Sequence, residues 1–240
     1  MTLRLSGVSA RHGRIVVCRN VALHVERGEV LVLLGPNGAG TSSTLGAIAG
    51  SVASSGEIFV DGHALQGRAA SRRARMGLSL VPEGRRNLFG ALSVAENLQI
   101  GVRLLASPQR AAALAQLYSS FPILEQRRAQ SAAMLSGGEQ QQLAIAVAIA
   151  RRPSVLLLDE PSQGLAPVAL DHLVQIIDSL RAQGLAVLLA EQNHAFAARL
   201  GDRFVALRAG EIVARGDRSQ LADRELAAVA MMGQSTPAIR

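Results

Sequence analysis

The first thirty residues carry short apolar stretches that alternate with polar positions. Examples are IVVC at residues 15–18 and VALHVERG at residues 21–28. Alternation with a period of two predicts strands that bury one face, so we expect antiparallel strands here. The next stretch, EVLVLLG at residues 29–35, is a continuous apolar run that ends in glycine. Such a run is typical of a strand buried on both faces.

The spacing of apolar residues changes twice further along the chain. TSSTLGAIAG at residues 41–50 predicts a helix closed by its final glycine, and short strands are expected at 56–62 and 77–84. From about residue 85 to residue 151 the apolar positions recur at helical spacing. Predicted strands and helices then alternate over 154–161, 166–184, 185–192, 193–201 and 203–216.

This order of elements predicts an α/β fold. We expect a mostly parallel core sheet with helices on both faces, an N-terminal antiparallel β subdomain and an inserted α-helical subdomain. One domain is expected over residues 1–232, with the helical subdomain at about 85–151. Residues 233–240 are expected to form a flexible C-terminal tail.

Composition narrows the class of protein. The chain has 240 residues, of which 49% are hydrophobic, enough for a sizeable core. No apolar run approaches the roughly 18 residues that a membrane helix needs. The first residues lack the apolar core of a signal peptide, so we expect no export. Cys18 is the single cysteine, so a disulfide framework and a cysteine metal site are excluded. We interpret it as a small strand residue in a reducing cytosol.

All 25 basic residues are arginine, and the sequence contains no lysine. The formal net charge is +7, but the arginines are scattered and aromatic residues make up 2% of the chain. A nucleic-acid surface that stacks bases is therefore not predicted, and the arginine content is interpreted as compositional drift. The absence of lysine matters for the loop described next.

Residues 35–42, GPNGAGTS, follow the phosphate-loop pattern G-x-x-x-x-G-K-[ST] except at Thr41. Glycines let successive backbone amides turn inward around phosphate oxygens, and the N-terminus of the following helix adds a favourable dipole. Ser42 is placed to bring its hydroxyl to Mg²⁺. The structural alternative is a simple corner between a strand and a helix.

SVLLLDEP at residues 154–161 ends an apolar strand in two carboxylates. Strand alternation is expected to point Asp159 and Glu160 to different sides. Asp159 then suits the shell of Mg²⁺, and Glu160 suits a general base for the water that attacks the γ-phosphate. The alternative is a strand end with two solvated acids, although open sheets bind ligands at this end.

LSGGEQQQL at residues 135–143 starts an apolar-faced helix with Ser136, Gly137 and Gly138. These residues form a second helix N-terminus that can bind an anion. Ser136 and Glu139 also fit a capping box. A capping box does not explain two glycines in the first turn, because glycine weakens a helix.

GPNGAG, LSGGEQQQL, VLLLDEP and SQGLAP follow one another in this order. With these motifs the chain resembles the ATP-binding subunit of an ABC transporter, from Leu3 to about Met232, which implies a P-loop NTPase ABC cassette. VPEGRRNLFGALSVAENL at 81–98 and LLAEQN at 188–193 resemble the ATPases of branched-chain amino-acid importers. Importers of urea and amides share that pattern.

The resemblance implies ATP and Mg²⁺ as cofactors, and ATP hydrolysis coupled to transport. Two such subunits pack head to tail, as a homodimer or a heterodimer, with each ATP between one chain's phosphate loop and the other's LSGGE. Transmembrane permease subunits dock near residues 83–98, and a solute-binding protein takes part indirectly. The chain is then expected in the cytoplasm, peripheral on the inner face of the cell membrane.

The resemblance also assigns roles by position. Glu160 and Gln192 are the expected catalytic residues, and Ser42, Asp159 and Glu83 are the expected metal site. The expected nucleotide contacts are Gly35, Pro36, Asn37, Gly38, Ala39, Gly40, Thr41, Ser42, Ser43 and His12, and in trans Ser136, Gly137, Gly138 and Glu139.

Four positions depart from the broad ABC pattern. Glu83 stands where most members have glutamine, and Gln192 stands where most have a histidine that touches the γ-phosphate; both look normal for branched-chain members. Gln192 can still donate a hydrogen bond. His12 replaces the aromatic residue that stacks on adenine, with an exposed turn histidine as the alternative. His194, two residues beyond the switch position, is interpreted as a solvated helix start.

Thr41 is the fourth departure. The lysine that it replaces reaches β- and γ-phosphate oxygens, whereas threonine is short and uncharged. A charge-assisted hydrogen bond contributes about 1.5–3 kcal/mol, and loss of a transition-state donor costs about 10²–10³ in rate. Any rescue must come from an arginine or from a partner chain. We expect weakened Mg-ATP binding and weakened hydrolysis at this chain's own site.

Three hypotheses follow from this departure. The chain can energise an importer, either as a homodimer with two slow sites or beside a lysine-bearing subunit that leaves one site whole. It can act as a clamp that closes on ATP without hydrolysing it. It can also be a decaying paralogue with no affinity for ATP.

Overall fold

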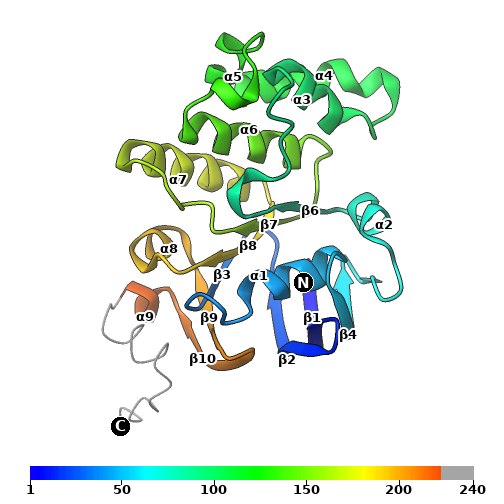
Figure 1. The fold of residues 1–240 in the computed structure, drawn as a ribbon, viewed down its shortest axis with the longest axis vertical. Coiled ribbons are helices and arrows are strands. Elements are labelled where there is room, and N and C mark those ends of the chain that lie inside the picture. Colours follow the sequence, from blue (N-terminus) through cyan, green and yellow to red (C-terminus); the bar gives the residue numbers. More distant parts are fainter. Residues whose placement is uncertain (223–240) are drawn as a thin grey trace.

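The computed structural model describes residues 1–222, and the predicted tail at 233–240 lies outside them. The strands form two sheets (Figure 1). The helical subdomain, in green, lies at the opposite end of the molecule from the smaller sheet. Over the described range, no helix is long and apolar enough to cross a bilayer.

The smaller sheet is the antiparallel β subdomain that the alternating pattern predicts. In sheet order its strands are β2 (Ile15–Val25), β1 (Leu3–His12), β4 (Ala53–Val60) and β5 (His63–Ala64). Leu3 lies opposite Val25 and Leu5 lies opposite Leu23, and all four side chains are buried. Burial of these facing pairs fixes the register of β1 against β2.

The core sheet is mostly parallel, as predicted. In sheet order its strands are β10 (Glu211–Asp217), β9 (Arg203–Arg208), β3 (Val30–Leu34), β8 (Ala186–Glu191), β7 (Val155–Asp159) and β6 (Leu78–Val81). Neighbouring strands from β9 to β6 are parallel, and β10 is antiparallel to β9. Every residue of β3, β7 and β8 is buried, which explains their continuous apolar sequences.

Strand β3 separates two hydrophobic cores. Val30, Val32 and Leu34 belong to the core shared with the helical subdomain. Leu31 and Leu33 belong to the core shared with the β subdomain. Successive side chains of a strand point to opposite faces, so five consecutive apolar residues serve both cores.

The helices pack on the core sheet or form the inserted subdomain. Those associated with the two sheets are α1 (Thr41–Ala49), α2 (Ala70–Arg75), α7 (Pro167–Ala182), α8 (His194–Leu200) and α9 (Arg218–Ala222). The inserted subdomain comprises the 3₁₀ turns η1 (Glu83–Arg85) and η2 (Ala132–Met134) and the helices α3 (Val94–Val102), α4 (Ser107–Ser120), α5 (Pro122–Gln126) and α6 (Gly137–Ile149). Gly50 ends α1 in the left-handed conformation, as its sequence predicts.

The buried side chain of Asn97 fixes the loop that leads into α3. Its Oδ1 accepts a hydrogen bond from the backbone N–H of Phe89 at 2.9 Å. Its Nδ2 donates to the carbonyl oxygens of Phe89 at 3.1 Å and Ser93 at 3.0 Å. One amide therefore satisfies backbone groups of a loop that has no sheet or helix of its own.

We expect Asn97→Ala to lower the free energy of unfolding by about 1–3 kcal/mol, because it leaves the partly buried backbone N–H of Phe89 without its partner and removes the bonds to two carbonyl oxygens. Chemical denaturation monitored by circular dichroism measures this change. Gln99→Ala, at an exposed position of the same helix, is the matched control and should stay within about 0.5 kcal/mol of the wild type. Equal stabilities of the two variants would contradict the role of Asn97.

Candidate functional site

The phosphate-loop sequence forms a tight turn between β3 and α1 that only glycine permits. Gly38 and Gly40 have φ values of 82° and 102°, in the left-handed region. A Cβ on Gly40 would lie 2.8 Å from Cys18 Sγ, and one on Gly35 would lie 2.7 Å from Ala39 Cβ. Helix α1 has no side-chain cap and no acidic residue in its first turn. Its N-terminal amides are thus available to an anion.

Ser42 and Asp159 meet at the head of this loop. Ser42 Oγ donates a hydrogen bond to Asp159 Oδ1 at 2.9 Å, across 117 positions of sequence. Asp159 is the buried last residue of β7, and burial raises its pKa while the bond from Ser42 opposes the rise. The sequence motifs assigned both residues to one Mg²⁺ site, and the contact brings them together; the metal role stays a prediction.

Thr41 is the first residue of α1 and is buried. Its methyl carbon Cγ2 lies 3.1 Å from the position that a Cβ on Gly35 would occupy. The side chain is therefore packed close against the loop's own backbone. Threonine is uncharged, so this side chain cannot replace the ammonium group that a lysine would place beside the phosphates.

Glu160 follows β7 in a left-handed turn, with φ of 48°. Its backbone N–H donates to the carbonyl oxygen of Ala190 at 3.0 Å. Strand alternation was expected to point Asp159 and Glu160 to different sides, and this reason was wrong. The strand ends at Asp159, so a turn and not strand alternation separates the two carboxylates.

Burial raises the pKa of Glu160 to about 7, and the neighbouring charge of Glu191 adds to the rise. Hydrogen bonds from the backbone and the side chain of Gln192 act in the opposite direction. The structure thus brings together the two residues that the sequence nominated as catalytic. A carboxyl with this pKa is part ionised near neutral pH, as a general base requires.

Glu191 is a residue that sequence reasoning missed. It is fully buried, and its carboxylate accepts hydrogen bonds from the backbone N–H groups of Ser162 at 2.9 Å and Asn193 at 3.3 Å. Burial raises its pKa. The available signal was an acid at the end of the otherwise apolar stretch 185–191, where a solvated residue would be out of place.

The turn after β6 reaches the same edge of the sheet. Glu83 begins this turn, and its backbone hydrogen bond lowers the pKa of Asp159 while its charge raises it. Arg85 Nη1 donates to the carbonyl oxygen of Gly137 at 3.1 Å. The turn therefore lies between Asp159, at the end of β7, and Gly137, at the start of α6.

His12 lies at the end of the β1–β2 hairpin, where its Nε2 is 3.2 Å from Ser43 Oγ. The sequence left open whether this histidine stacks on adenine or is an exposed turn residue; the side chain is exposed, and the contact places it against the first turn of α1. His194 begins α8, as predicted. Its Nε2 is buried without a hydrogen-bond partner, so the prediction of a solvated side chain was wrong for this atom.

Ser136 and Glu139 form the predicted capping box at the start of α6. Glu139 N donates to Ser136 Oγ at 3.3 Å, and Ser136 N donates to Glu139 Oε2 at 2.8 Å. A Cβ on Gly138 would lie 2.8 Å from Ala169 Cβ, so close packing against α7 explains one of the two glycines. No hydrogen bond joins this turn to residues 35–42 in the part of the chain that the structure describes.

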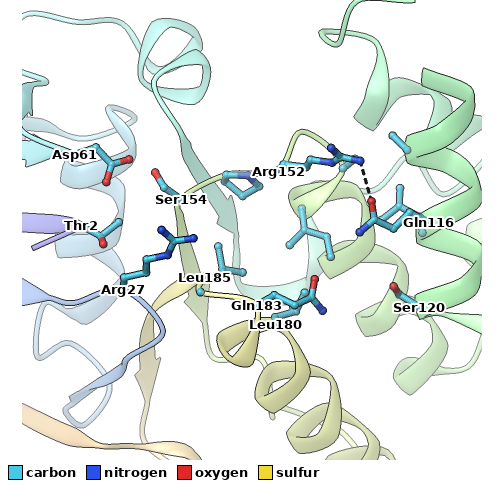
Figure 2. Close-up of a pocket in the computed structure, with 16 residues that line it drawn as sticks. Thr2, Arg27, Asp61, Gln116, Ser120, Arg152, Ser154, Leu180, Gln183 and Leu185 are labelled. Carbon is cyan, nitrogen blue, oxygen red and sulfur yellow. Dashed lines mark hydrogen bonds between the residues drawn. The ribbon is translucent and has the colours of Figure 1, made fainter. Parts of the chain in front are cut away.

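A cavity of about 570 Å³ opens away from this site, where β7 and β8 begin (Figure 2). Its polar wall includes Arg27, Ser154 and Gln183, and Arg152 donates to Gln116 Oε1 at 2.9 Å within it. None of the predicted site residues lines this cavity. The chemistry-bearing residues instead gather at the carboxyl ends of the strands.

Among residues 1–222 no group of three or more histidine, cysteine, aspartate or glutamate side chains could hold a metal ion by itself. The hydroxyl of Ser42 and the carboxylate of Asp159 are nevertheless hard oxygen ligands in contact with each other. Mg²⁺ takes one or two protein oxygens and completes its shell with water and phosphate oxygens. The donor set therefore fits Mg²⁺ that arrives with a nucleotide.

A sequence profile of the ABC transporter family matches residues 18–163. The high-affinity branched-chain amino acid transport ATP-binding protein BraG of Pseudomonas aeruginosa is 41% identical over 212 residues, which cover 88% of this chain and 91% of BraG. The lipopolysaccharide export system ATP-binding protein LptB of Escherichia coli is 34% identical over 220 residues, which cover 90% of each chain.

A solved ATP-binding subunit of an ABC transporter has the same fold. It superposes with a TM-score of 0.80 at 29% sequence identity, and the match covers 96% of this chain and 99% of that one. The family match at residues 18–163 spans the loop at 35–42, the acids Asp159 and Glu160 and the capped helix α6. The chain thus belongs to the ABC transporter family, as one of its ATP-binding subunits.

Proposed function

We propose that this subunit serves an importer of branched-chain or related amino acids, and that it couples ATP binding and hydrolysis to transport. ABC ATP-binding subunits in general bind ATP with Mg²⁺, dimerise and pair with transmembrane permeases. The similarity to BraG supports the amino-acid assignment. LptB, a relative of similar coverage, serves export, so family membership alone does not indicate import. Glu83 and Gln192, which look normal for branched-chain members, therefore support the importer assignment.

The hydrogen bond between Ser42 and Asp159 is the observation that carries this function. It joins the glycine loop to a buried acid at the carboxyl edge of a parallel sheet, where such sheets bind ligands. The crowding at Gly35 and Gly40 supports the same assignment, because a loop without side chains lets backbone amides approach phosphate oxygens closely.

Each residue then has a defined task. The backbone N–H groups of the loop at residues 35–42, apart from Pro36, which has none, would hold the phosphates. Ser42 and Asp159, with Glu83 beside them, would hold Mg²⁺. Bound Mg²⁺ neutralises charge on the phosphate oxygens. The Glu160 carboxylate takes a proton from the attacking water, and Gln192 orients that carboxylate through the bonds described above.

The remaining assignments extend to a second chain. Residues 136–139 would close over the nucleotide bound to the other subunit. His12 would lie against the adenine of the nucleotide bound to its own subunit. The permease would dock near residues 83–98, on the cytoplasmic side of the membrane. A solute-binding protein would deliver the solute without touching this chain.

A second candidate function follows from Thr41. With an uncharged, inward-packed side chain at this position, the site would bind Mg-ATP weakly and hydrolyse it slowly. The subunit would then act as a clamp, or beside an active subunit to which it contributes residues 136–139. Pairing with a lysine-bearing subunit gives one complete site and one slow site.

We expect Thr41→Lys to raise hydrolysis at this chain's own site by about 10²-fold or more, the rate that a transition-state donor contributes. Single-turnover hydrolysis in the reconstituted transporter measures it. Arg72→Lys, on the exposed surface of α2, is a control that adds a lysine without changing the charge of the phosphate loop. Unchanged hydrolysis together with normal Mg-ATP binding would argue against a defect caused by Thr41.

Hydrolysis by the Thr41→Lys variant should rise from pH 6 to pH 8 with a midpoint near 7. The reason is that the pKa of Glu160 is raised to about 7, so its carboxyl is largely protonated at pH 6 and cannot accept a proton. Glu160→Gln should suppress the rate throughout and leave Mg-ATP binding intact.

Glu57→Gln, which removes an exposed acid from β4, should keep the profile. A rate that is flat over this pH range, or that survives Glu160→Gln, would exclude Glu160 as the base.

A further inference from the structure

The edge of the sheet that we propose for the nucleotide is crowded with acidic side chains. Its carboxylates are those of Glu83, Asp159, Glu160 and Glu191. A triphosphate adds more negative charge, and Thr41 supplies none of the positive charge that a lysine would bring. A cation from another part of the chain would relieve this imbalance.

Because the chain has no lysine, its permanently charged basic side chains are all arginines. Arg85 and Arg86 both follow β6, at the correct edge. Arg85 is already engaged through its bond to the carbonyl oxygen of Gly137. Arg86 is exposed, and within the described range it forms no hydrogen bond and no ion pair. Its guanidinium can turn toward a ligand without breaking an existing contact.

Sheet register places the turn that carries Arg86. Strands β6 and β7 pair in parallel with Val81 opposite Leu158, so the residues after β6 lie beside Asp159. Within this turn Gly84 has a left-handed backbone, with φ of 67°. Arg86 Nε lies 3.9 Å from the position that a Cβ on Gly84 would occupy, so the arginine side chain folds back over the turn.

The charge of Arg86 affects Asp159, which lies beside the phosphate loop. Burial is the main cause of the raised pKa of Asp159, and Arg86 is among the groups that lower it. Asp159 is also the acceptor of the Ser42 hydroxyl. Arg86 therefore lies within electrostatic reach of the pair that would hold Mg²⁺ and phosphate.

We propose that Arg86 supplies, to the phosphates of a bound nucleotide, the positive charge that Thr41 does not. The inference rests on the proposed nucleotide-binding function. A guanidinium stays charged at physiological pH and can bond two phosphate oxygens at once. It comes from a neighbouring turn on a flexible stem, so it is not fixed on the charge that develops during hydrolysis. Arg86 therefore contributes to affinity more than to turnover.

A double-mutant cycle on the full chain tests this proposal through equilibrium binding of Mg-ATP. In the wild type, Arg86→Ala should weaken binding about tenfold or more, as expected for a lost charge-assisted hydrogen bond. In the Thr41→Lys background the same change should weaken binding less than about threefold, because the loop then carries its own charge. Arg86→Lys should weaken binding less than Arg86→Ala does, because it keeps the charge and loses only the bidentate geometry.

Arg72→Ala is the matched control. It removes an exposed arginine from α2, which precedes the amino end of β6, whereas Arg86 follows the carboxyl end of that strand. Its binding should equal that of the wild type. Thermal unfolding without nucleotide verifies that each variant is folded.

Three results would overturn the role of Arg86: no loss of binding on Arg86→Ala, an equal loss in both backgrounds, or binding by Thr41→Lys but not by the wild type. In the last case nucleotide binding by this fold would stand. Absence of binding in both chains would instead remove the proposed function itself, and the inference with it.

Discussion

Across three parallel strands, Leu34 of β3 pairs with Glu191 of β8, and Ala190 of β8 pairs with Asp159 of β7. This register brings the ends of the three strands into one row, and the glycine loop starts directly after it. A slip of one residue would turn every side chain of a strand to the opposite face. Because all three strands are buried on both sides, the two cores hold the register. The site takes its geometry from core packing.

The same arrangement explains the electrostatics. Burial raises the pKa values of Asp159, Glu160 and Glu191, because the strands that end in these acids lie deep in the molecule. A nearby cation stabilises the ionised form of such carboxylates. All 25 basic Lys/Arg-type side chains of this protein are arginines, and some of them serve the structure. Arg73, for example, is buried and donates to the carbonyl oxygens of Ala47 and Ile48 at the end of α1.

Sequence patterns predicted both sheets, most of the helices and the residues around Ser42 and Asp159, because period and glycine placement follow from local backbone rules; α2 and α9 were not predicted. The roles of these residues with a nucleotide stay predictions. Glu191 escaped notice because an acid in a strand is interpretable only once its partners, the amides of Ser162 and Asn193, are known. The left-handed turn at Glu160 and the contact of Gly138 with Ala169 depend on tertiary packing, which no local pattern encodes.

The bond from Arg85 to Gly137 would matter if two chains packed head to tail, as the proposed function has it. Within one subunit it ties the turn beside its own acids to the serine–glycine start of α6. If that start closes over the other subunit's nucleotide, the state of one site is relayed mechanically to its twin. Two unequal sites would then still open and shut in step, with the stronger one pacing the weaker.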